Sequence, residues 1–275
     1  MPIDSRRALL LRKLEDSKQV VLTALELHGS ENLSIAWTGG KDSTLVVYIA
    51  RLACAEAGAA VPACFLIDEG DVFPMVRAFV DRLAAAWDLR VSVLHNHDVS
   101  RAASGQLGSE VHVAALDERN RAEIERLGYE EDTFVYEPES FVGNHLMKTA
   151  VLNRYLYASG VTGFLAGIRW DEQGARADET HFSPRSETPY NPAHTRISPI
   201  LHYTERDVWD TIHWRGIPYC SLYSQGYRSL GARVTTVRVS DQPAWEQDLE
   251  NTDERGGRRQ DKEDLMRKFR DLGYM

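Results

Sequence analysis

The sequence predicts an α/β protein with a doubly wound, mostly parallel five-stranded sheet and an irregular C-terminal extension. Two observations indicate this fold class. Short, continuous apolar runs alternate with longer stretches of helical periodicity, as expected when helices cover both faces of a parallel sheet. Charged residues also follow directly after several of these runs, and ligands bind at the carboxyl ends of parallel strands.

The first elements are a helix, a strand and a second helix. Residues 5–28 carry leucine and valine at helical spacing, and Gly29 ends this pattern. Residues 33–37 predict a buried strand and residues 45–52 an apolar helix. The segment 38–44 between them reads TGGKDST. Such a glycine turn directs backbone N–H groups and a helix N-terminus at a phosphate, so it predicts a nucleotide loop.

Each position of this loop has a predicted role. The two glycines, Gly39 and Gly40, let the backbone approach a phosphate group. Lys41 would neutralise its charge, and the hydroxyls of Ser43 and Thr44 would donate hydrogen bonds to it.

Two further features of the loop concern its class and a metal ion. A Walker A loop needs a glycine five positions before the Gly-Lys pair, and Ile35 stands there instead. Asp42 could hold a magnesium ion or merely cap the helix. Both interpretations of Asp42 stay open on the sequence alone.

The middle of the chain adds strands and candidate polar residues. Strands are predicted at 61–67 and 90–94, with a helix at 74–87 between them. Asp68 follows the first of these strands and could contact a ribose or a metal, although a turn or capping role is as good an interpretation. His95 and His97 share one face, but the sequence offers no third ligand, so a metal site there is disfavoured.

The second half of the chain contains two strands and a long loop. Residues 98–140 predict a solvated helix and loops. Further elements are expected as a helix at 143–157, strands at 163–168 and 197–200, and a capped helix at 204–214. The segment 169–195 is rich in Pro, Ser, Thr and Asn and predicts a loop over the carboxyl edge of the sheet.

The first domain would span 1–215, and the extension 216–275 would end in an amphipathic helix that runs to Leu272.

Three arginines on the predicted loop are candidate anion ligands. A guanidinium binds two oxygens at once, so Arg169, Arg176 and Arg185 could hold an oxyanion or a phosphate. The alternative is salt bridges with the acidic residues that lie between them in the sequence.

Composition limits the partners and the compartment. A net charge of −9 gives no general attraction to nucleic acid. The three cysteines form no Cys-x-x-Cys pair, and neither a signal peptide nor a run of eighteen apolar residues occurs. We therefore expect a cytoplasmic protein with reduced thiols, no membrane contact, and a homo-oligomer as one possible assembly.

Laid end to end, the motifs resemble the phosphoadenosine phosphosulfate (PAPS) reductase superfamily of PP-loop ATP pyrophosphatases, which have an adenine nucleotide alpha-hydrolase-like fold. The resemblance is greatest to the small subunit of bacterial sulfate adenylyltransferase. It rests on the segments 38–43 (TGGKDS), 67–70 (IDEG), 145–149 (HLMKT), 167–172 (GIRWDE), 182–185 (FSPR), 203–209 (YTERDVW), 226–231 (GYRSLG) and 272–275 (LGYM).

This resemblance implies cleavage of ATP, with Mg²⁺, between the α- and β-phosphates to adenylylate an oxyanion, with sulfate as the first candidate, beside a GTPase large subunit. The implied catalytic residues are Lys41, Asp42, Ser43, Arg169 and Arg176, with Asp42 as a possible metal ligand. The implied nucleotide-binding residues are Trp37, Thr38, Gly39, Gly40, Thr44, Asp68 and Gly167. The implied acceptor-binding residues are His145, Lys148, Asp171 and Arg185.

Three other functions are compatible with a nucleotide-binding protein of this kind. The reductases of the superfamily attack sulfur with a cysteine in a C-terminal Glu-Cys-Gly motif, and no cysteine follows Cys220 here, so reduction is disfavoured. An ATP pyrophosphatase of a DNA phosphorothioation or RNA thiolation system, working with a cysteine desulfurase, is the first alternative. A non-catalytic adenine-nucleotide-binding subunit is the second.

Overall fold

A six-stranded sheet forms the centre of the protein. The computed structural model describes residues 3–172, 176, 179–188 and 191–254. The sheet order is β3-β2-β1-β6-β8-β7, and the first five strands are parallel. The strands are β1 (Leu33–Ala36), β2 (Ala63–Ile67), β3 (Val91–Leu94), β6 (Gly163–Leu165), β7 (Phe182–Arg185) and β8 (His194–Ile197). The predicted mostly parallel α/β fold is confirmed.

The number of strands is corrected from five to six. Strand β7 lies inside the predicted long loop and pairs antiparallel with β8 at the edge of the sheet, where Pro184 faces Thr195. Proline is tolerated on an edge strand because its missing N–H leaves no central ladder incomplete. Strand β8 also lies earlier than the predicted 197–200, since it ends at Ile197, two residues before Pro199.

Helices cover both faces of the sheet. The helices are α1 (Ile3–His28), α2 (Lys41–Ala57), α3 (Pro74–Trp87), α4 (His97–Ala102), α5 (Glu118–Arg126), α6 (Phe141–Asn144), α7 (Ala150–Ser159) and α8 (Glu205–Arg215). Ile35 and Leu165 pack into the main core with α1, α2, α3 and α8, whereas Phe65 and Phe164 pack with Leu156 of α7. Because successive strand residues point to opposite faces, this division confirms the doubly wound arrangement.

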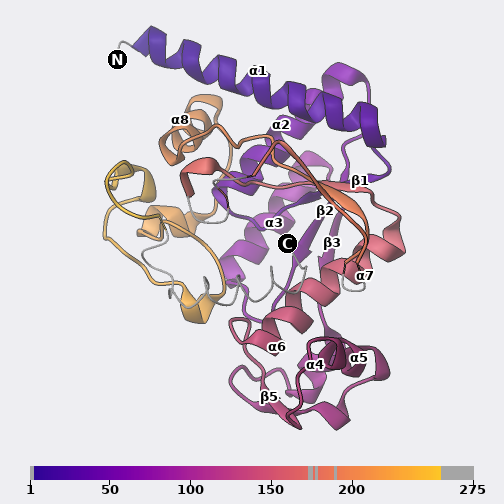
Figure 1. Ribbon diagram of the computed structural model, residues 1–275. Coiled ribbons are helices and arrows are strands. Elements are labelled where there is room, and N and C mark those ends of the chain that lie inside the picture. The colour runs from indigo at the N-terminus through magenta and orange to yellow at the C-terminus, as the bar shows by residue number, and fades with distance from the viewer. Residues whose placement is uncertain (1–2, 173–175, 177–178, 189–190, 255–275) are drawn as a thin grey trace.

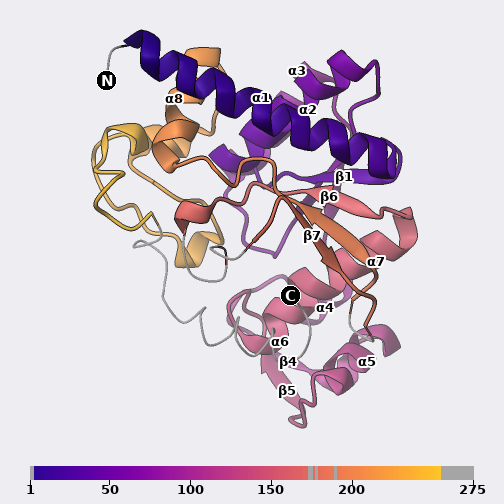
Figure 2. The same ribbon diagram turned by 45° about the horizontal axis from the view of Figure 1, so that its top comes forward.

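Residues 97–149 form a small subdomain, not the solvated helix and loops predicted for 98–140. A two-stranded antiparallel sheet, β4 (Glu110–His112) and β5 (Thr133–Val135), packs with α4, α5 and α6 around its own apolar cluster. In Figures 1 and 2 these elements lie at the opposite end of the molecule from α1. A π-helical turn, His145–Thr149, joins α6 to α7 within the predicted helix.

The C-terminal extension is irregular as far as the structure describes it. Its described part contains the 3₁₀ turns Ser221–Gln225, Arg233–Thr235 and Ala244–Glu246, and two more, Val113–Ala115 and Trp170–Glu172, lie earlier in the described chain. Cys220, Leu222 and Tyr223 belong to the main core, so this segment packs on the sheet domain beside α8 (Figure 1). The helix predicted up to Leu272 lies outside the described residues. None of the described helices is both long and apolar enough to span a membrane.

Asp207 joins α8 to α1. Its carboxylate accepts from the backbone N–H of Thr204 at 2.8 Å, and the Thr204 hydroxyl accepts from the N–H of Asp207 at 3.2 Å, which confirms the predicted capping box. Lys13 and Arg6 of α1 also contact the same carboxylate, at 2.5 and 2.7 Å. Burial alone would raise the pKa of Asp207, but these hydrogen bonds and charges lower it on balance.

We expect Asp207→Asn to lower the free energy of unfolding at pH 7 by about 2–3 kcal/mol, because it removes a cap and two charge-assisted hydrogen bonds. A depressed folded-state pKa adds stability above the unfolded value of about 3.9, and this stability disappears as the pH falls through the folded value. The difference from wild type should therefore shrink below about pH 4 in urea titrations. Asp210→Asn, at a more exposed partner of Arg6, should have a smaller effect.

Candidate active site

The predicted nucleotide loop follows β1 and leads directly into α2. Trp37 is fully buried, and its indole N–H donates to the Thr44 hydroxyl at 3.0 Å. Its ring meets Phe79 of α3 edge-on, with centroids 6.4 Å apart. Both predicted nucleotide-binding side chains, Trp37 and Thr44, thus lie beneath the loop, which leaves only their backbone atoms for a ligand.

Hydrogen bonds of the Thr38 and Ser43 hydroxyl groups stabilise the conformation of the loop. The Ser43 hydroxyl lies 3.1 Å from the Thr38 hydroxyl and donates to the carbonyl of Gly40 at 3.1 Å. Helix α2 begins at Lys41 and has no side-chain cap. The N–H groups of its first turn therefore lack an intrahelical acceptor, and the helix dipole favours an anion beside them.

Two glycines allow the close packing around the loop. Gly39 has φ = +76°, and a Cβ there would lie 2.7 Å from a methyl group of Val76. A Cβ on Gly167, just after β6, would lie 2.7 Å from the backbone nitrogen of Ser43. Gly167 thus lets the start of α2 pack against the end of β6, which explains its place in the site without any contact to a nucleotide.

Gly39→Ala should lower the free energy of unfolding by about 2 kcal/mol or more, because the left-handed conformation and the contact with Val76 both oppose a side chain. Gly58→Ala is the matched control, since Gly58 has φ = +63° and open space around its Cβ. Its loss should be limited to about 1 kcal/mol. Equal losses in urea denaturation would contradict the proposed close packing of the loop on α3.

Lys41 is buried, with 1% of its surface exposed, and acidic residues surround it. Its Nζ lies 2.5 Å from Glu254, 3.3 Å from Asp42 and 3.7 Å from Glu205. Burial would lower the pKa of Lys41, but these carboxylates hold it above its ordinary value. The lysine of the loop is therefore a charged ammonium in a site shielded from water.

Arg169 brings a second buried cation to the same place. It follows β6, and its guanidinium contacts Asp42, Glu254 and, at 2.8 Å, Asp171. Burial would lower the pKa of Arg169, but the surrounding carboxylates raise it. Lys41 and Arg169 share Asp42 and Glu254 as partners, so two predicted catalytic cations converge at the N-terminus of α2.

Three more buried residues, Glu205, Tyr223 and Arg228, support this cluster. None of them was predicted from the sequence as a site residue. Glu205, in the first turn of α8, accepts from Arg228 at 2.8 and 3.0 Å, and both residues are buried. The Tyr223 hydroxyl accepts from the backbone N–H of Lys41 at 2.9 Å. The segments YTERDVW and GYRSLG contain Glu205 and Arg228, but nothing in their spacing showed that these side chains pair.

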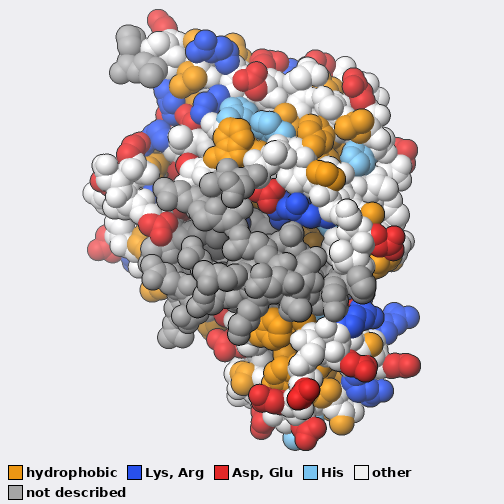
Figure 3. Space-filling model, viewed as in Figure 1, with side chains coloured by type: hydrophobic (Ala, Val, Ile, Leu, Met, Phe, Trp, Pro, Cys, Tyr) orange, Lys and Arg blue, Asp and Glu red, His pale blue; other side chains and the backbone are white. Residues whose placement is uncertain are grey.

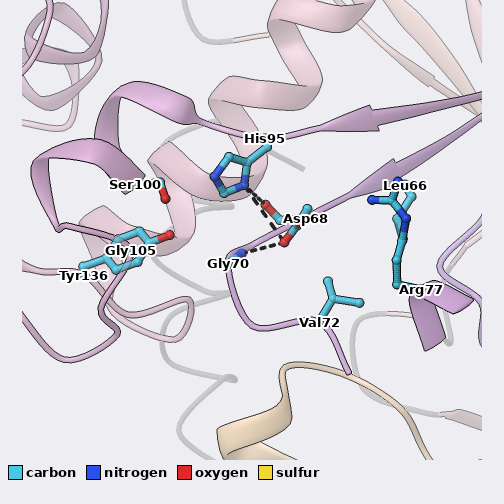
Figure 4. A pocket seen from close by; sticks show the side chains of 9 residues that line it. All are labelled: Leu66, Asp68, Gly70, Val72, Arg77, His95, Ser100, Gly105 and Tyr136. Carbon is cyan, nitrogen blue, oxygen red and sulfur yellow. Dashed lines mark hydrogen bonds and ion pairs between the residues drawn. The ribbon is translucent and has the colours of Figure 1, made fainter. Parts of the chain in front are cut away.

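A cavity of about 350 Å³ opens at the carboxyl ends of β2 and β3. Figure 4 shows Asp68 and His95 on one wall and Tyr136 of the small subdomain on another. The Asp68 carboxylate accepts from the N–H of Gly70 at 2.9 Å, and a His95 ring nitrogen lies 2.8 Å from the Asp68 carbonyl oxygen. The cavity therefore presents a carboxylate at the position predicted to contact a ribose.

Of the four predicted acceptor ligands, Asp171 joins the cation cluster through Arg169, whereas the other three pair elsewhere. His145 is fully buried and its Nε2 lies 2.8 Å from Glu123 of the small subdomain, while Lys148 pairs with Glu69 at 2.6 Å. The other loop residues pair locally: Arg176 with Glu172, Arg185 with Glu179, and Asp171 with Arg169 and the N–H of Glu205. For Arg176 and Arg185 the salt-bridge interpretation thus describes this structure. Their roles toward an acceptor stay predictions.

The residues around the loop do not form a ready metal site. Both carboxylate oxygens of Asp42 face cations, one Arg169 and the other Lys41. Among the residues that the structure describes, no three histidine, cysteine or acidic side chains are grouped to hold a metal. The prediction that Asp42 binds Mg²⁺ gains no support from this geometry, and we derive no step through a metal.

Figure 3 shows the character of one face of the molecule. On the described part of this face, acidic and basic side chains are interspersed, with no broad basic patch.

Comparison with known proteins identifies the family. Residues 101–238 match the phosphoadenosine phosphosulfate reductase domain family. The chain belongs to this family. A phosphoadenosine 5'-phosphosulfate reductase of Xanthomonas axonopodis pv. citri is 28% identical over 237 residues, which are 86% of this chain and 82% of the relative. A probable FAD synthase of Caenorhabditis briggsae is 25% identical over 86% of this chain and 36% of its own.

Solved structures share the fold of this PAPS reductase family member. The Candida glabrata FMN adenylyltransferase, in complex with FMN and an ATP analogue, has a TM-score of 0.61 at 15% identity and covers 86% of this chain and 68% of its own. A PAPS reductase from Candida auris has a TM-score of 0.56 at 17% identity, and the match covers 86% of this chain and 98% of that reductase. The chain is thus a nucleotide-binding enzyme of the PP-loop type. The greater resemblance to the sulfate adenylyltransferase small subunit stays a prediction.

Proposed function

We propose that this protein transfers the adenylyl group of ATP to an oxyanion acceptor, with sulfate as the first candidate, and releases pyrophosphate. The observation that carries this proposal is the convergence of Lys41 and Arg169 at the N-terminus of α2. Two buried cations beside a helix dipole form a site for the charge that develops on a leaving pyrophosphate.

The chemistry assigns a role to each group of the loop. The acceptor oxygen attacks the α-phosphorus in line, and the bond to the β-phosphate oxygen breaks. The Lys41 ammonium, the Ser43 hydroxyl and the other N–H groups of the first turn of α2 then stabilise the charge on the departing oxygen. Arg169 binds a phosphate or acceptor oxygen with its planar fork. No side-chain nucleophile is required.

The cavity beside Asp68 is the proposed site for the adenosine. Its size suits a nucleoside, and it lies at the carboxyl edge of the sheet, where folds of this type bind ligands. The Asp68 carboxylate can accept a hydrogen bond from a ribose hydroxyl.

The cysteines argue against a reductase, although several relatives are reductases by name. All three cysteines of the sequence are buried. Burial raises the pKa of Cys54 to about 11 and that of Cys64 to about 12, and it also raises the pKa of Cys220. Attack on sulfur needs an accessible thiolate, and none of these thiols supplies one.

The comparisons also favour adenylyl transfer. One relative is a probable FAD synthase, and solved structures of the same fold include an FMN adenylyltransferase with an ATP analogue. FMN carries a phosphate monoester, which is an oxyanion like sulfate. We therefore treat FMN as a second acceptor of the same reaction.

The test measures pyrophosphate and AMP-linked product from ATP with sulfate, FMN, single-stranded DNA or no acceptor. The sulfate reaction is repeated with GTP and a GTPase large subunit, and the DNA reaction with a cysteine desulfurase. Acceptor-dependent pyrophosphate release supports the proposal and identifies the acceptor. Release of ADP and orthophosphate overturns it, because the bond cleaved is then the β–γ bond.

A further inference from the structure

The carboxylate of Glu254 occupies the place between the two loop cations. It accepts from Lys41 Nζ at 2.5 Å and from the guanidinium of Arg169. The residue lies 213 positions from Lys41 in the sequence, so only tertiary folding brings it here. A carboxylate held by a lysine and an arginine makes the same kind of contact that a phosphate oxygen makes.

Arg228 ties the segment 248–254, which carries Glu254, to the folded core. Its guanidinium donates to the carbonyls of Leu249 at 3.3 Å and Thr252 at 3.0 Å, and also to the Thr252 hydroxyl. On its other side it is paired with the buried Glu205. The segment is therefore fastened two residues before Glu254, which places its carboxylate at the loop.

The charges of the cluster indicate that Glu254 and a phosphate ligand compete for the same two cations. Three cations of the cluster, Lys41, Arg169 and Arg228, face four carboxylates: Asp42, Asp171, Glu205 and Glu254. A triphosphate or pyrophosphate brings several more negative charges into this buried site. Like charges in a low-dielectric surrounding repel strongly, so displacement of one of the four carboxylates would favour phosphate binding.

We propose that Glu254 is a built-in competitor of phosphate, an autoinhibitory contact that must leave Lys41 and Arg169 before a nucleotide or pyrophosphate can bind. The segment 248–254 then acts as a strap, which is closed when Glu254 contacts both cations and open when phosphate takes the place of Glu254. This inference rests on the proposed function only in assuming that a phosphate group binds at the loop.

The test compares wild type with Glu254→Gln for binding of pyrophosphate and of a non-hydrolysable ATP analogue by calorimetry. The amide keeps the shape but removes the charge, so the closed state is weakened. Because closure lowers the apparent affinity by the fraction of open molecules, we expect the variant to bind about ten-fold tighter or more. Glu250→Gln is the matched control. Glu250 lies on the same strap but pairs with Arg206 at the surface, so its substitution should leave both affinities unchanged.

A second measurement follows the strap itself. Hydrogen exchange of residues 248–254 should rise when wild type is saturated with pyrophosphate, since the segment keeps Arg228 but loses the contacts of Glu254. Equal affinities of wild type and Glu254→Gln, weaker binding by the variant, or unchanged exchange each overturn the inference. If neither protein binds pyrophosphate or the analogue, the proposed function fails as well, which separates the two failures.

Discussion

Replacement of Lys41 by methionine is expected to reduce acceptor-dependent pyrophosphate release by about a hundred- to a thousand-fold. The ammonium of Lys41 is almost fully buried at the start of α2, as is Arg169. Its electrostatic interaction with a leaving group is stronger where water is excluded. Methionine keeps the length and apolar stem of lysine without its charge. The measurement is single-turnover release of pyrophosphate at saturating ATP.

The variant also leaves three carboxylates without their partner. The resulting loss of stability must be measured separately from the loss of catalysis. Asp42, Glu205 and Glu254 all lie within 3.7 Å of Lys41 Nζ, so Lys41→Met should lose stability. Lys41→Met combined with Glu254→Gln removes one charge of each sign and should recover part of the unfolding free energy. Activity should stay low in both. Release above about a tenth of the wild-type rate would mean that the leaving group does not depend on this lysine.

Truncation of Arg228 to methionine is expected to lower the free energy of unfolding by about 3–5 kcal/mol, because it leaves the buried Glu205 without its partner. Arg228 also holds three backbone carbonyls of the strap, those of Asp248, Leu249 and Thr252. The loss is therefore both a buried charge and the attachment of the segment 248–254. Urea denaturation followed by circular dichroism measures it.

Two controls test why Arg228→Met should lower the free energy of unfolding. Arg101→Met removes an exposed ion pair with Asp98 and should change stability by less than about 1 kcal/mol. Adding Glu205→Gln to Arg228→Met neutralises the orphaned carboxylate and should restore part of the loss. If Arg228→Met is as mild as Arg101→Met, the buried pair is not a main support of the site.

Local pattern was enough for the elements whose hydrophobic period is long or whose caps are distinct. Helix α1 and the capping box of Thr204 and Asp207 follow directly from residue spacing. The small subdomain was missed because its elements are three to nine residues long and its core comes from scattered positions such as Val111 and Phe134. Strand β7 was missed because four residues with a proline resemble a loop until an edge is available.

The local sequence determined one part of this protein: a strand, a glycine turn with Lys41, and a helix N-terminus, on a doubly wound α/β sheet. Together they predict a phosphate site. These features depend on neighbours in the sequence, through backbone dihedrals and the period of burial. The folded structure alone decided which charges meet there. Arg169, Glu205, Arg228 and Glu254 come from segments far apart in the chain, and ion pairs over such separations leave no spacing pattern. They form because buried charges must find a partner wherever the fold brings one within reach.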